Sequence, residues 1–243
     1  MKLKRYYVNQ NLVVGENVSL EGDEFHHMAN VMRTREGDRV ELFCGDGNNY
    51  LATVYGLSKK HADLHIDSVT KSMAEPNTKL DVYQALAKGD KLSLITQKIT
   101  ELGASKLVLF DSKFCDVKVN TTRANKLDLV TISACKQCGM STPVQIEGIL
   151  SIKDVCKKIK SYDKFFVFYE NQEGITLKDE LLKILKNKNQ KVAIMIGAEG
   201  GFEQGEIESL KQAGATVVSL GKRILRTETA AIAGAAVVMQ LLD

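Results

Sequence analysis

The residues best suited to ligand chemistry lie in one short charged segment near the C-terminal end. Residues 220–230 read LGKRILRTETA and combine three cations with the carboxylate of Glu228. An apolar run at 216–219 precedes this segment, and a run of small residues at 231–240 follows it, so we expect a loop from a strand to a helix. Loops of this kind carry ligand sites in open α/β sheets. A loop that only joined two apolar elements would not need so many charged groups.

A second loop of the same type is expected at residues 194–202, which read IMIGAEGGF. Its three glycines let the backbone approach a ligand closely. The dinucleotide pattern G-x-G-x-x-G fails because Glu199 occupies its second glycine position, where a carboxylate would repel a pyrophosphate. A P-loop pattern does not occur in the sequence either. A ligand with hydroxyls or a positive charge, such as a nucleoside with a sulfonium, suits the loop better; alternatively, Glu199 only complements a helix dipole, worth up to about 1 kcal/mol.

The bulk composition is that of an ordinary globular protein. The chain has 243 residues, of which 44% are hydrophobic and 26% charged, with a formal net charge of +3. This mild charge permits nucleic-acid binding but does not demonstrate it. We see no apolar signal-peptide core and no run long enough to span a bilayer. Five scattered cysteines fit reduced thiols, so we expect a cytoplasmic protein with no membrane partner.

The pair Cys135 and Cys138 could suggest a metal. No second pair of this spacing exists, and a structural zinc site needs four ligands. The pair also falls within a helical pattern. We therefore interpret both as helix thiols and predict no metal site.

Two domains are expected, 1–72 and 73–243, with the boundary in the polar, proline-containing stretch 71–78. Short strand-like runs separated by Gly-Asp turns predict a small β-barrel in the first domain. It should contain one helix that begins at an Asp23 cap. Its apolar stripe is expected to consist of Phe25, Met28, Ala29 and Met32.

The second domain alternates apolar strands with amphipathic helices, which predicts an α/β fold with a parallel sheet covered on both faces. The expected strands are 80–86, 106–110, 164–169, 190–196 and 216–220, and the expected helices are 90–102, 122–138, 152–159, 177–185, 204–213 and 227–242. Gly103 and Gly214 stand where residues that follow a helix end should stand.

The two charged loops together resemble the paired motifs of the SPOUT methyltransferases, and in particular the RsmE family, which methylates N3 of one uridine in bacterial 16S ribosomal RNA. The similarity is carried by 84–91, 97–103, 196–202 and 220–230, and on the N-terminal side by His27, 31–33 and 37–38. It covers nearly the whole chain. Three positions depart from the family pattern: Ala198 replaces a usual Pro, Met140 a usual Arg, and 112–115 a stretch resembling Ser-Glu-Arg-Ser.

The resemblance implies a parallel-sheet SPOUT-like domain with a trefoil knot, behind an N-terminal PUA-like β-barrel that binds RNA. It further implies S-adenosylmethionine as cofactor, 16S rRNA within the small ribosomal subunit as partner, and a homodimer. The small residues of the last helix, Ala231, Gly234, Ala235 and Ala236, are compatible with close packing against a second copy, and equally with packing inside one chain.

Site residues follow from the same motifs. The predicted catalytic residues are Arg226, Glu228 and Glu199. The predicted cofactor-binding residues are Tyr169, Gly197, Glu199, Gly200, Gly201, Leu220, Gly221, Ile224, Leu225 and Thr229. The predicted RNA-binding residues are Arg5, His27, Arg33, Lys88 and Arg223.

Several of these roles have alternatives. Uridine N3 must lose a proton, so Glu228 and Glu199 are candidate bases or cofactor anchors. Arg226 would hold the uridine anion or an adjacent phosphate. Arg226 and Glu228 could instead form only a surface ion pair, worth roughly 0–1 kcal/mol. His27 could pack rather than touch RNA, and the N-terminal cations could form an ordinary solvated face.

Two other functions compete with the methyltransferase. The departures at Met140 and Ala198 would also fit an RNA-binding module that has lost catalysis. A nicotinamide-dependent oxidoreductase is disfavoured by Glu199 and by the missing dinucleotide pattern.

Overall fold

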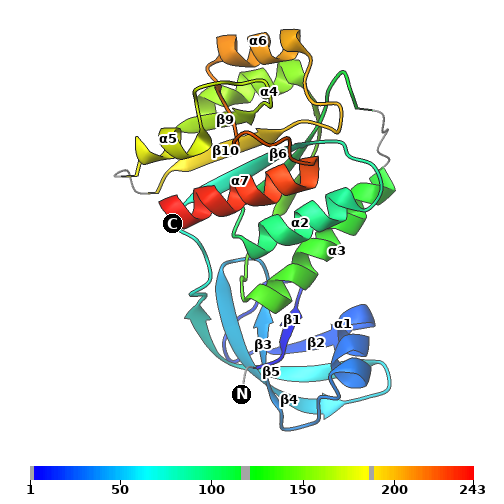
Figure 1. Ribbon diagram of the computed structural model, residues 1–243. Helices are drawn as coiled ribbons and strands as arrows, with labels where there is room; N and C mark the ends of the chain where they lie inside the picture. The colour runs from blue at the N-terminus through cyan, green and yellow to red at the C-terminus, as the bar shows by residue number, and fades with distance from the viewer. Residues whose placement is uncertain (1–2, 116–120, 186–188) are drawn as a thin grey trace. The chain divides into compact units, whose positions relative to one another are not determined.

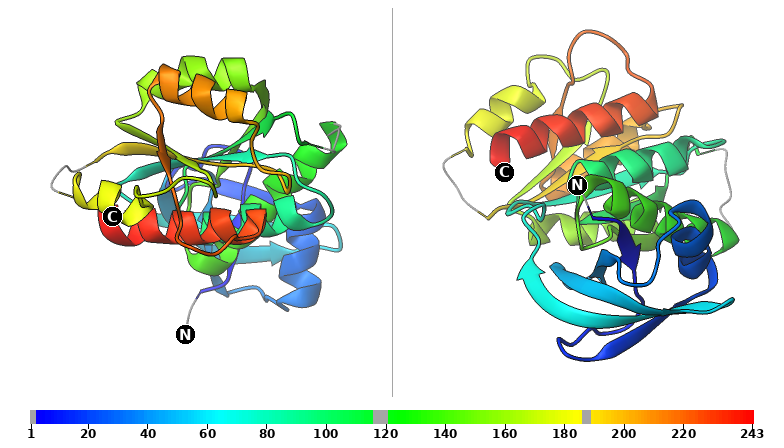
Figure 2. Two further views of the ribbon diagram at one scale, coloured as in Figure 1. Left: turned by 45° about the horizontal axis from the view of Figure 1, so that its top comes forward. Right: turned by 90° about the horizontal axis from the view of Figure 1, so that it is seen from below.

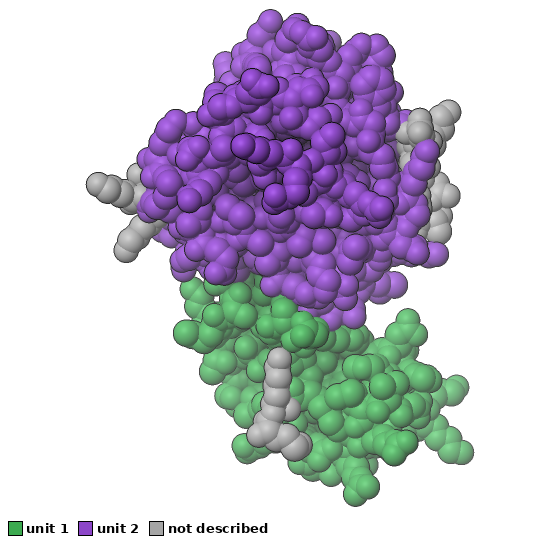
Figure 3. Space-filling model, viewed as in Figure 1, with its two compact units in different colours: residues 1–75, 135–143 green, residues 76–134, 144–243 purple. Residues whose placement is uncertain are grey.

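A computed structural model describes residues 3–115, 121–185 and 189–243. The chain divides into two compact units, which are described separately (Figures 1 and 3). Unit 1 comprises Met1–Glu75 together with Cys135–Pro143, and unit 2 comprises Pro76–Ala134 and Val144–Asp243. Unit 1 is therefore discontinuous in sequence.

Unit 1 is built on a five-stranded sheet in the order β1-β3-β4-β5-β2. The strands are β1 (Arg5–Tyr7), β2 (Asn17–Glu21), β3 (Arg39–Phe43), β4 (Asn48–Leu57) and β5 (His61–Lys71). β1 pairs with β3 in parallel, and the remaining pairs are antiparallel. The expected barrel takes the form of a curled half-barrel sheet whose edges are β1 and β2 (Figure 2). Alternate side chains such as Val40, Leu42, Leu64 and Ile66 fill its core.

The helix of unit 1 differs from its prediction. It runs as α1 (Gly22–His26) directly into a π-helical turn, η1 (His27–Val31). The residue at its N-cap is Glu21, without a side-chain cap, so the predicted Asp23 cap is wrong. The wider turn, closed by the Met32 N–H to the His27 carbonyl, rotates Met32 out of the expected stripe, and its side chain is 37% exposed.

Unit 2 contains a six-stranded parallel sheet in the order β11-β9-β10-β6-β7-β8. The strands are β6 (Lys79–Ala85), β7 (Lys106–Asp111), β8 (Gln145–Ser151), β9 (Lys164–Phe168), β10 (Lys191–Ile196) and β11 (Thr216–Val218). The central strands are buried on both faces, as expected for a parallel sheet. β8 was not predicted from the sequence because it is an edge strand and much of it is exposed.

Helices cover both faces of this sheet, which confirms the predicted α/β architecture. They are α2 (Lys91–Glu101), α3 (Thr121–Cys138), α4 (Ile152–Lys158), the 3-10 turn η2 (Ile159–Ser161), α5 (Leu177–Leu182), α6 (Gln204–Ala213) and α7 (Thr227–Leu242). α4 and α6 lie on one face, and α2, α5 and α7 lie on the other (Figures 1 and 2). Gly103 and Gly214 follow α2 and α6 with φ of +86° and +107°, the left-handed geometry that ends a helix. In the described part of the chain, no helix has both the length and the apolar character needed to cross a membrane.

The small residues of α7 pack inside the chain. Ala231 and Ala235 are fully buried. A Cβ added to Gly234 would lie 2.2 Å from Cε2 of Phe168, so the helix backbone rests directly on that ring. Of the two uses left open for this face, the structure therefore supports packing within one chain for these three residues.

Candidate active site

A cavity of about 390 Å³ opens where the loops after β9, β10 and β11 converge. This is the carboxyl edge of the parallel sheet, the place where open α/β sheets bind ligands. The cavity is lined by Lys91, residues 168–170, 196–199, 201–202, 219–221 and 223–227, and Ala230. The two charged loops singled out in the sequence thus line one cavity.

The glycine-rich turn after β10 is packed so tightly that side chains would not fit. A Cβ on Gly197 would lie 3.1 Å from the Phe202 ring, and a Cβ on Gly201 would lie 2.7 Å from Oε1 of Glu170. Gly201 also has a φ of +71° and donates its N–H to the Ala198 carbonyl at 3.0 Å. The glycines therefore shape the cavity wall and permit close backbone approach.

The side chain of Thr227 connects the loop after β11 to the loop after β10. Its hydroxyl donates to the Gly197 carbonyl at 2.7 Å and accepts from Nε2 of Gln84 at 2.9 Å. Both Thr227 and Gln84 are buried, so these bonds are shielded from water. Sequence reasoning assigned neither residue, although each stands inside a recognised motif.

Lys91, at the start of α2, is a third site residue that was not predicted from the sequence. Its Nζ lies 2.6 Å from Oε1 of Glu199 and 3.8 Å from Oε2 of Glu228. The backbone N–H of Lys88 also donates to the Glu199 carboxylate at 3.3 Å. Partial burial raises the pKa of Glu199, but the hydrogen bonds from Lys91 and from backbone N–H groups outweigh burial and lower its pKa below the ordinary value. Glu199 is thus a paired, ionised group rather than only a complement to a helix dipole.

Arg226 occupies the N-cap position of α7 and lines the cavity with its side chain exposed. Glu228 faces Lys91, and among the described residues the structure gives the Arg226 guanidinium no carboxylate partner. The alternative of an Arg226–Glu228 surface ion pair is therefore not formed. The guanidinium is available to a ligand.

The predicted cofactor residues mostly reach this cavity. Those that line it are Tyr169, Gly197, Glu199, Gly201, Leu220, Gly221, Ile224 and Leu225. Gly200 instead packs against Phe114, because a Cβ there would lie 2.7 Å from the Phe114 Cβ. Thr229 is exposed on α7 and does not line the cavity. The apolar wall formed by Phe168, Ile196 and Ala230 was not predicted.

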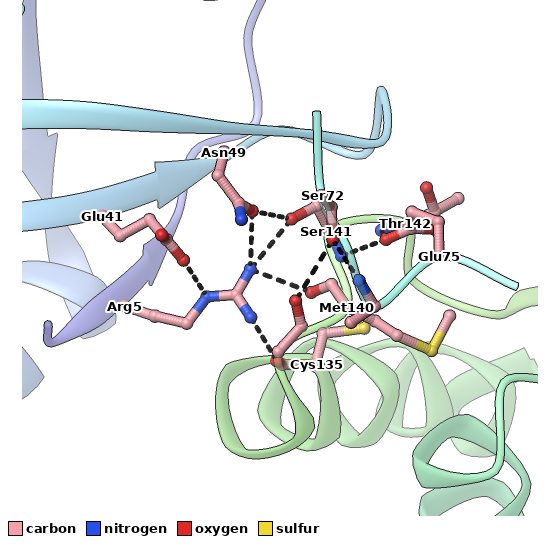
Figure 4. Close-up of polar contacts among 11 residues, drawn as sticks. Arg5, Glu41, Asn49, Ser72, Glu75, Cys135, Met140, Ser141 and Thr142 are labelled. Carbon is pink, nitrogen blue, oxygen red and sulfur yellow. Dashed lines mark hydrogen bonds and ion pairs between the residues drawn. The ribbon is translucent and has the colours of Figure 1, made fainter. Parts of the chain in front are cut away.

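Arg5, predicted to bind RNA, has a different place. Its side chain is buried in unit 1 (Figure 4). Nη1 donates to the Cys135 carbonyl at 3.2 Å, and Nη2 lies within 3.2 Å of acceptors on Asn49, Met140 and Ser141. This correction has a simple cause: residues remote in sequence supply the acceptors.

Further contacts complete the cluster around Arg5. Its Nε lies 2.8 Å from Oε1 of Glu41, an ion-pair distance without the alignment of a hydrogen bond. The guanidinium also sits 5.0 Å from the centre of the Phe43 ring. Glu75 accepts from the backbone N–H of Ser141 at 2.5 Å. Arg5 therefore holds residues 135–141 against the curled sheet.

The other predicted RNA contacts are scattered over both units. His27 is half-buried, and its ring meets Tyr6 edge-on at 5.9 Å, which fits the alternative of a packing role. Arg33 is exposed with a φ of +49°, an uncommon conformation for a residue other than glycine. Lys88 and Arg223 are exposed in unit 2, and Arg223 lines the cavity.

Cys135 is fully buried, and burial raises the pKa of its thiol to about 12, whereas Cys138 is half-buried. Within the described ranges, no three metal-ligating side chains gather into a group.

Comparison with known proteins agrees with this geometry. Residues 74–239 match the RNA methyltransferase domain family, and residues 20–67 match the RNA methyltransferase PUA domain. The ribosomal RNA small subunit methyltransferase E of Rickettsia conorii is 32% identical over 99% of this chain and 97% of its own length, and that of Bacillus subtilis is 30% identical over 94% and 93%. The chain belongs to the ribosomal RNA small subunit methyltransferase E family. The resemblance found in the sequence is therefore confirmed.

Solved structures of similar proteins share the whole fold. The methyltransferase E of Neisseria gonorrhoeae, bound to S-adenosyl methionine, superposes with a TM-score of 0.90 at 29% identity, covering 99% of this chain and 98% of that one. A Legionella pneumophila protein in complex with the bound cofactor S-adenosylmethionine gives a TM-score of 0.88 at 28% identity, with the same coverage. The α/β domain and the PUA-like N-terminal domain of the family are thus both present.

Proposed function

We propose that this methyltransferase E family member transfers a methyl group from S-adenosylmethionine to N3 of one uridine in 16S rRNA of the small ribosomal subunit. The observation that carries the proposal is the convergence of the two charged loops on one cavity. Relatives of the same fold, from Neisseria gonorrhoeae and Legionella pneumophila, bind S-adenosylmethionine.

The residues of the cavity fit this cofactor. Its volume of about 390 Å³ falls in the range of small-molecule sites, roughly 300–1,000 Å³. Phe168 and Ile196 offer an apolar wall, and the carboxylates of Glu170 and Glu199 suit a cationic ligand. The missing side chain at Gly201 lets the Glu170 carboxylate approach the backbone, because a Cβ there would lie 2.7 Å from Oε1 of Glu170. Bound there, the cofactor would supply a methyl group on a sulfonium.

The protein's own groups then position the acceptor and manage its charge. Positioning alone can lower a barrier by about 7–11 kcal/mol. Arg226, which has no carboxylate partner among the described residues, would stabilise the anion that forms when the uridine N3 loses its proton. Glu228 and Glu199 are the candidate bases. His27, Arg33, Lys88 and Arg223 are the proposed RNA contacts that remain once Arg5 is assigned to the interior of unit 1.

We propose that the two domains expected from the sequence divide this function between them. Residues 1–72 would bind RNA, and residues 73–243 would carry the transferase site. We also propose that the protein acts as a homodimer in the cytoplasm.

Changing Arg226 to Ala tests the assignment of the site. We expect methyl transfer to unmodified small subunits to fall about 10²–10³-fold, the usual effect of removing a group that stabilises developing charge. S-adenosylmethionine affinity, measured by calorimetry, should stay unchanged. Lys222→Ala is the matched control, because Lys222 is exposed in the same loop but does not line the cavity. Normal transfer by the Arg226 variant would contradict the role.

Mapping modified uridines in ribosomal RNA tests the substrate. Cells that lack the protein should lose one N3-methyluridine from 16S rRNA, and the gene should restore it. Loss of a different modification, or of none, would contradict the proposed acceptor.

A further inference from the structure

The two carboxylates that the sequence offers as candidate bases lie in different environments. Glu199 lines the cavity, whereas Glu228 follows the lining residue Thr227 without lining the cavity itself. Lys91 contacts both, but at unequal distances: 2.6 Å from Nζ to Oε1 of Glu199, and 3.8 Å to Oε2 of Glu228. Only the shorter distance is a hydrogen bond. The Lys91 ammonium therefore hydrogen-bonds to Glu199 and not to Glu228.

Glu199 is occupied by this arrangement. Besides Lys91, it accepts the backbone N–H of Lys88 at 3.3 Å, so it joins the loop after β10 to the loop before α2. A carboxylate held by a cation and a peptide N–H is stabilised in its charged form and accepts a proton poorly. Its contacts suit a group that holds the cavity wall in place.

Glu228 is different. Its side chain is 15% exposed, and its Oε2 is buried with no hydrogen-bond donor in the described part of the chain. Buried acceptors are nearly always satisfied, so an unsatisfied one calls for an explanation, and catalysis is one. Rotation about the last side-chain torsion, which is broad and two-fold, can exchange the two oxygens and present a free lone pair.

We propose that Lys91 is a positioning residue that separates the two carboxylates by role, so that Glu199 anchors the cavity wall and Glu228 accepts the proton of the acceptor base. This inference rests on the proposed function. In the step, the N–H bond of the uracil ring breaks and its proton bonds to a Glu228 oxygen. The electron pair stays on the ring nitrogen and forms its bond to the incoming methyl group, whose bond to the donor sulfur breaks and leaves its electron pair on that sulfur as a neutral thioether. Glu228 later returns the proton to water.

Replacing each carboxylate tests this division. Single-turnover methyl transfer to unmodified small subunits is measured at saturating S-adenosylmethionine, together with cofactor affinity by calorimetry and the midpoint of thermal unfolding. We expect Glu228→Gln to lower the transfer rate about 10²–10⁴-fold, the usual contribution of a general base, with affinity and unfolding midpoint unchanged. Glu199→Gln should weaken cofactor binding. Glu208→Gln, on the exposed side of α6, is the control that should change nothing.

Chemical rescue separates a proton acceptor from a merely structural carboxylate. Added formate should restore part of the rate in Glu228→Ala, whose missing group leaves space, and should not restore Glu199→Ala. Lys91→Met should lower the rate, and Lys91→Arg should recover most of it. Because the formate and lysine results do not depend on Glu228→Gln folding well, the proposal stays testable if that variant is unstable.

The outcomes are distinct. A wild-type rate in Glu228→Gln, or formate rescue of Glu199→Ala alone, would overturn the division of roles. If the wild-type protein itself transferred no methyl group to small subunits, the proposed function would fail instead.

Discussion

Arg5 in unit 1 and Lys91 in unit 2 are both cations paired with carboxylates, but they complete their surroundings to different degrees. The Arg5 guanidinium is buried, and it has an acceptor or a carboxylate near each nitrogen (Figure 4). Lys91 is 31% exposed, and one buried oxygen of Glu228 has no donor among the residues that the structure describes. We call the first cluster closed because each Arg5 nitrogen has a partner within 3.2 Å, even though Nε is not aligned for a hydrogen bond to Glu41. The Glu228 oxygen lies 3.8 Å from the Lys91 ammonium and has capacity left for a ligand.

Because of this difference, we expect the Arg5 cluster to contribute mainly to folding stability and the Lys91 pair mainly to activity. A buried charge with every partner in place costs much when one partner is removed, since the remaining groups stay desolvated. A half-exposed pair beside a cavity contributes little to folding, because water screens it. The charge type alone therefore does not tell which cluster serves the fold and which serves the chemistry.

The largest expected effect is that of Arg5→Met. The substitution would remove the ion-pair partner of Glu41 and the hydrogen-bond donors to the carbonyl groups of Cys135 and Met140 in unit 1. The free energy of unfolding should fall by about 3–5 kcal/mol in urea titration. Arg39→Met, on an exposed position of β3, is the control and should change it by less than about 0.5 kcal/mol. A drop no larger than that of the control would mean that the Arg5 cluster is not closed.

A smaller loss is expected for Ser141→Ala. The Ser141 hydroxyl accepts from Arg5 Nη2 at 2.9 Å and contacts Asn49 Oδ1, and the residue is fully buried. Its removal leaves both partners short of one bond, which should cost about 1–3 kcal/mol in the same titration. No loss at all would indicate that water replaces the hydroxyl.

Lys91→Met should change the free energy of unfolding by less than about 1 kcal/mol, the usual range for an exposed pair. The methyl-transfer rate of this variant should nevertheless fall, because Glu199 and Glu228 lose the cation proposed to position them. A loss of stability as large as that of Arg5→Met would remove the contrast between the two clusters.

The smallest effect is a dependence on pH. The pKa of Glu199 is lowered from its ordinary value of 4.5, so its pairing stabilises the folded state above that pH and is lost as the pH falls below it. The stability gap between the wild type and Glu199→Gln, a few tenths of a kcal/mol for such a pair, should therefore shrink as the pH falls below 4.5 and close once Glu199 is protonated in the folded state. A gap that widened in acid would contradict the pairing with Lys91.

The sequence predicted the alternating elements of unit 2 and the two charged loops, because both depend on local patterns. It did not predict β8, whose exposed edge position gives a weak apolar signal. It also placed Arg5 on an RNA-binding surface, since three of the acceptors of its guanidinium, on Cys135, Met140 and Ser141, lie 130 or more positions away in the chain. The trefoil knot implied by the resemblance stays a prediction. No local sequence pattern indicates whether a chain passes through one of its own loops.

Lys91 was missed for a related reason. The sequence shows it as one more cation near the start of a helix, and only the folded chain brings it within 2.6 Å of Glu199. Conversely, the pairing of Arg226 with Glu228 is suggested by their closeness in sequence, yet Glu228 contacts Lys91 instead. Contacts between distant segments decide which charges remain available.

The insertion of Cys135–Pro143 into unit 1 has a consequence for synthesis. A nascent chain that ends at Glu75 contains Arg5, Glu41 and Asn49, but not the acceptors on Cys135, Met140 and Ser141. The N-terminal unit therefore cannot reach its final form on the ribosome until Pro143 has emerged, although domains usually fold in the order in which they are made. A fragment expressed for RNA-binding work should accordingly carry residues 135–143 on a linker.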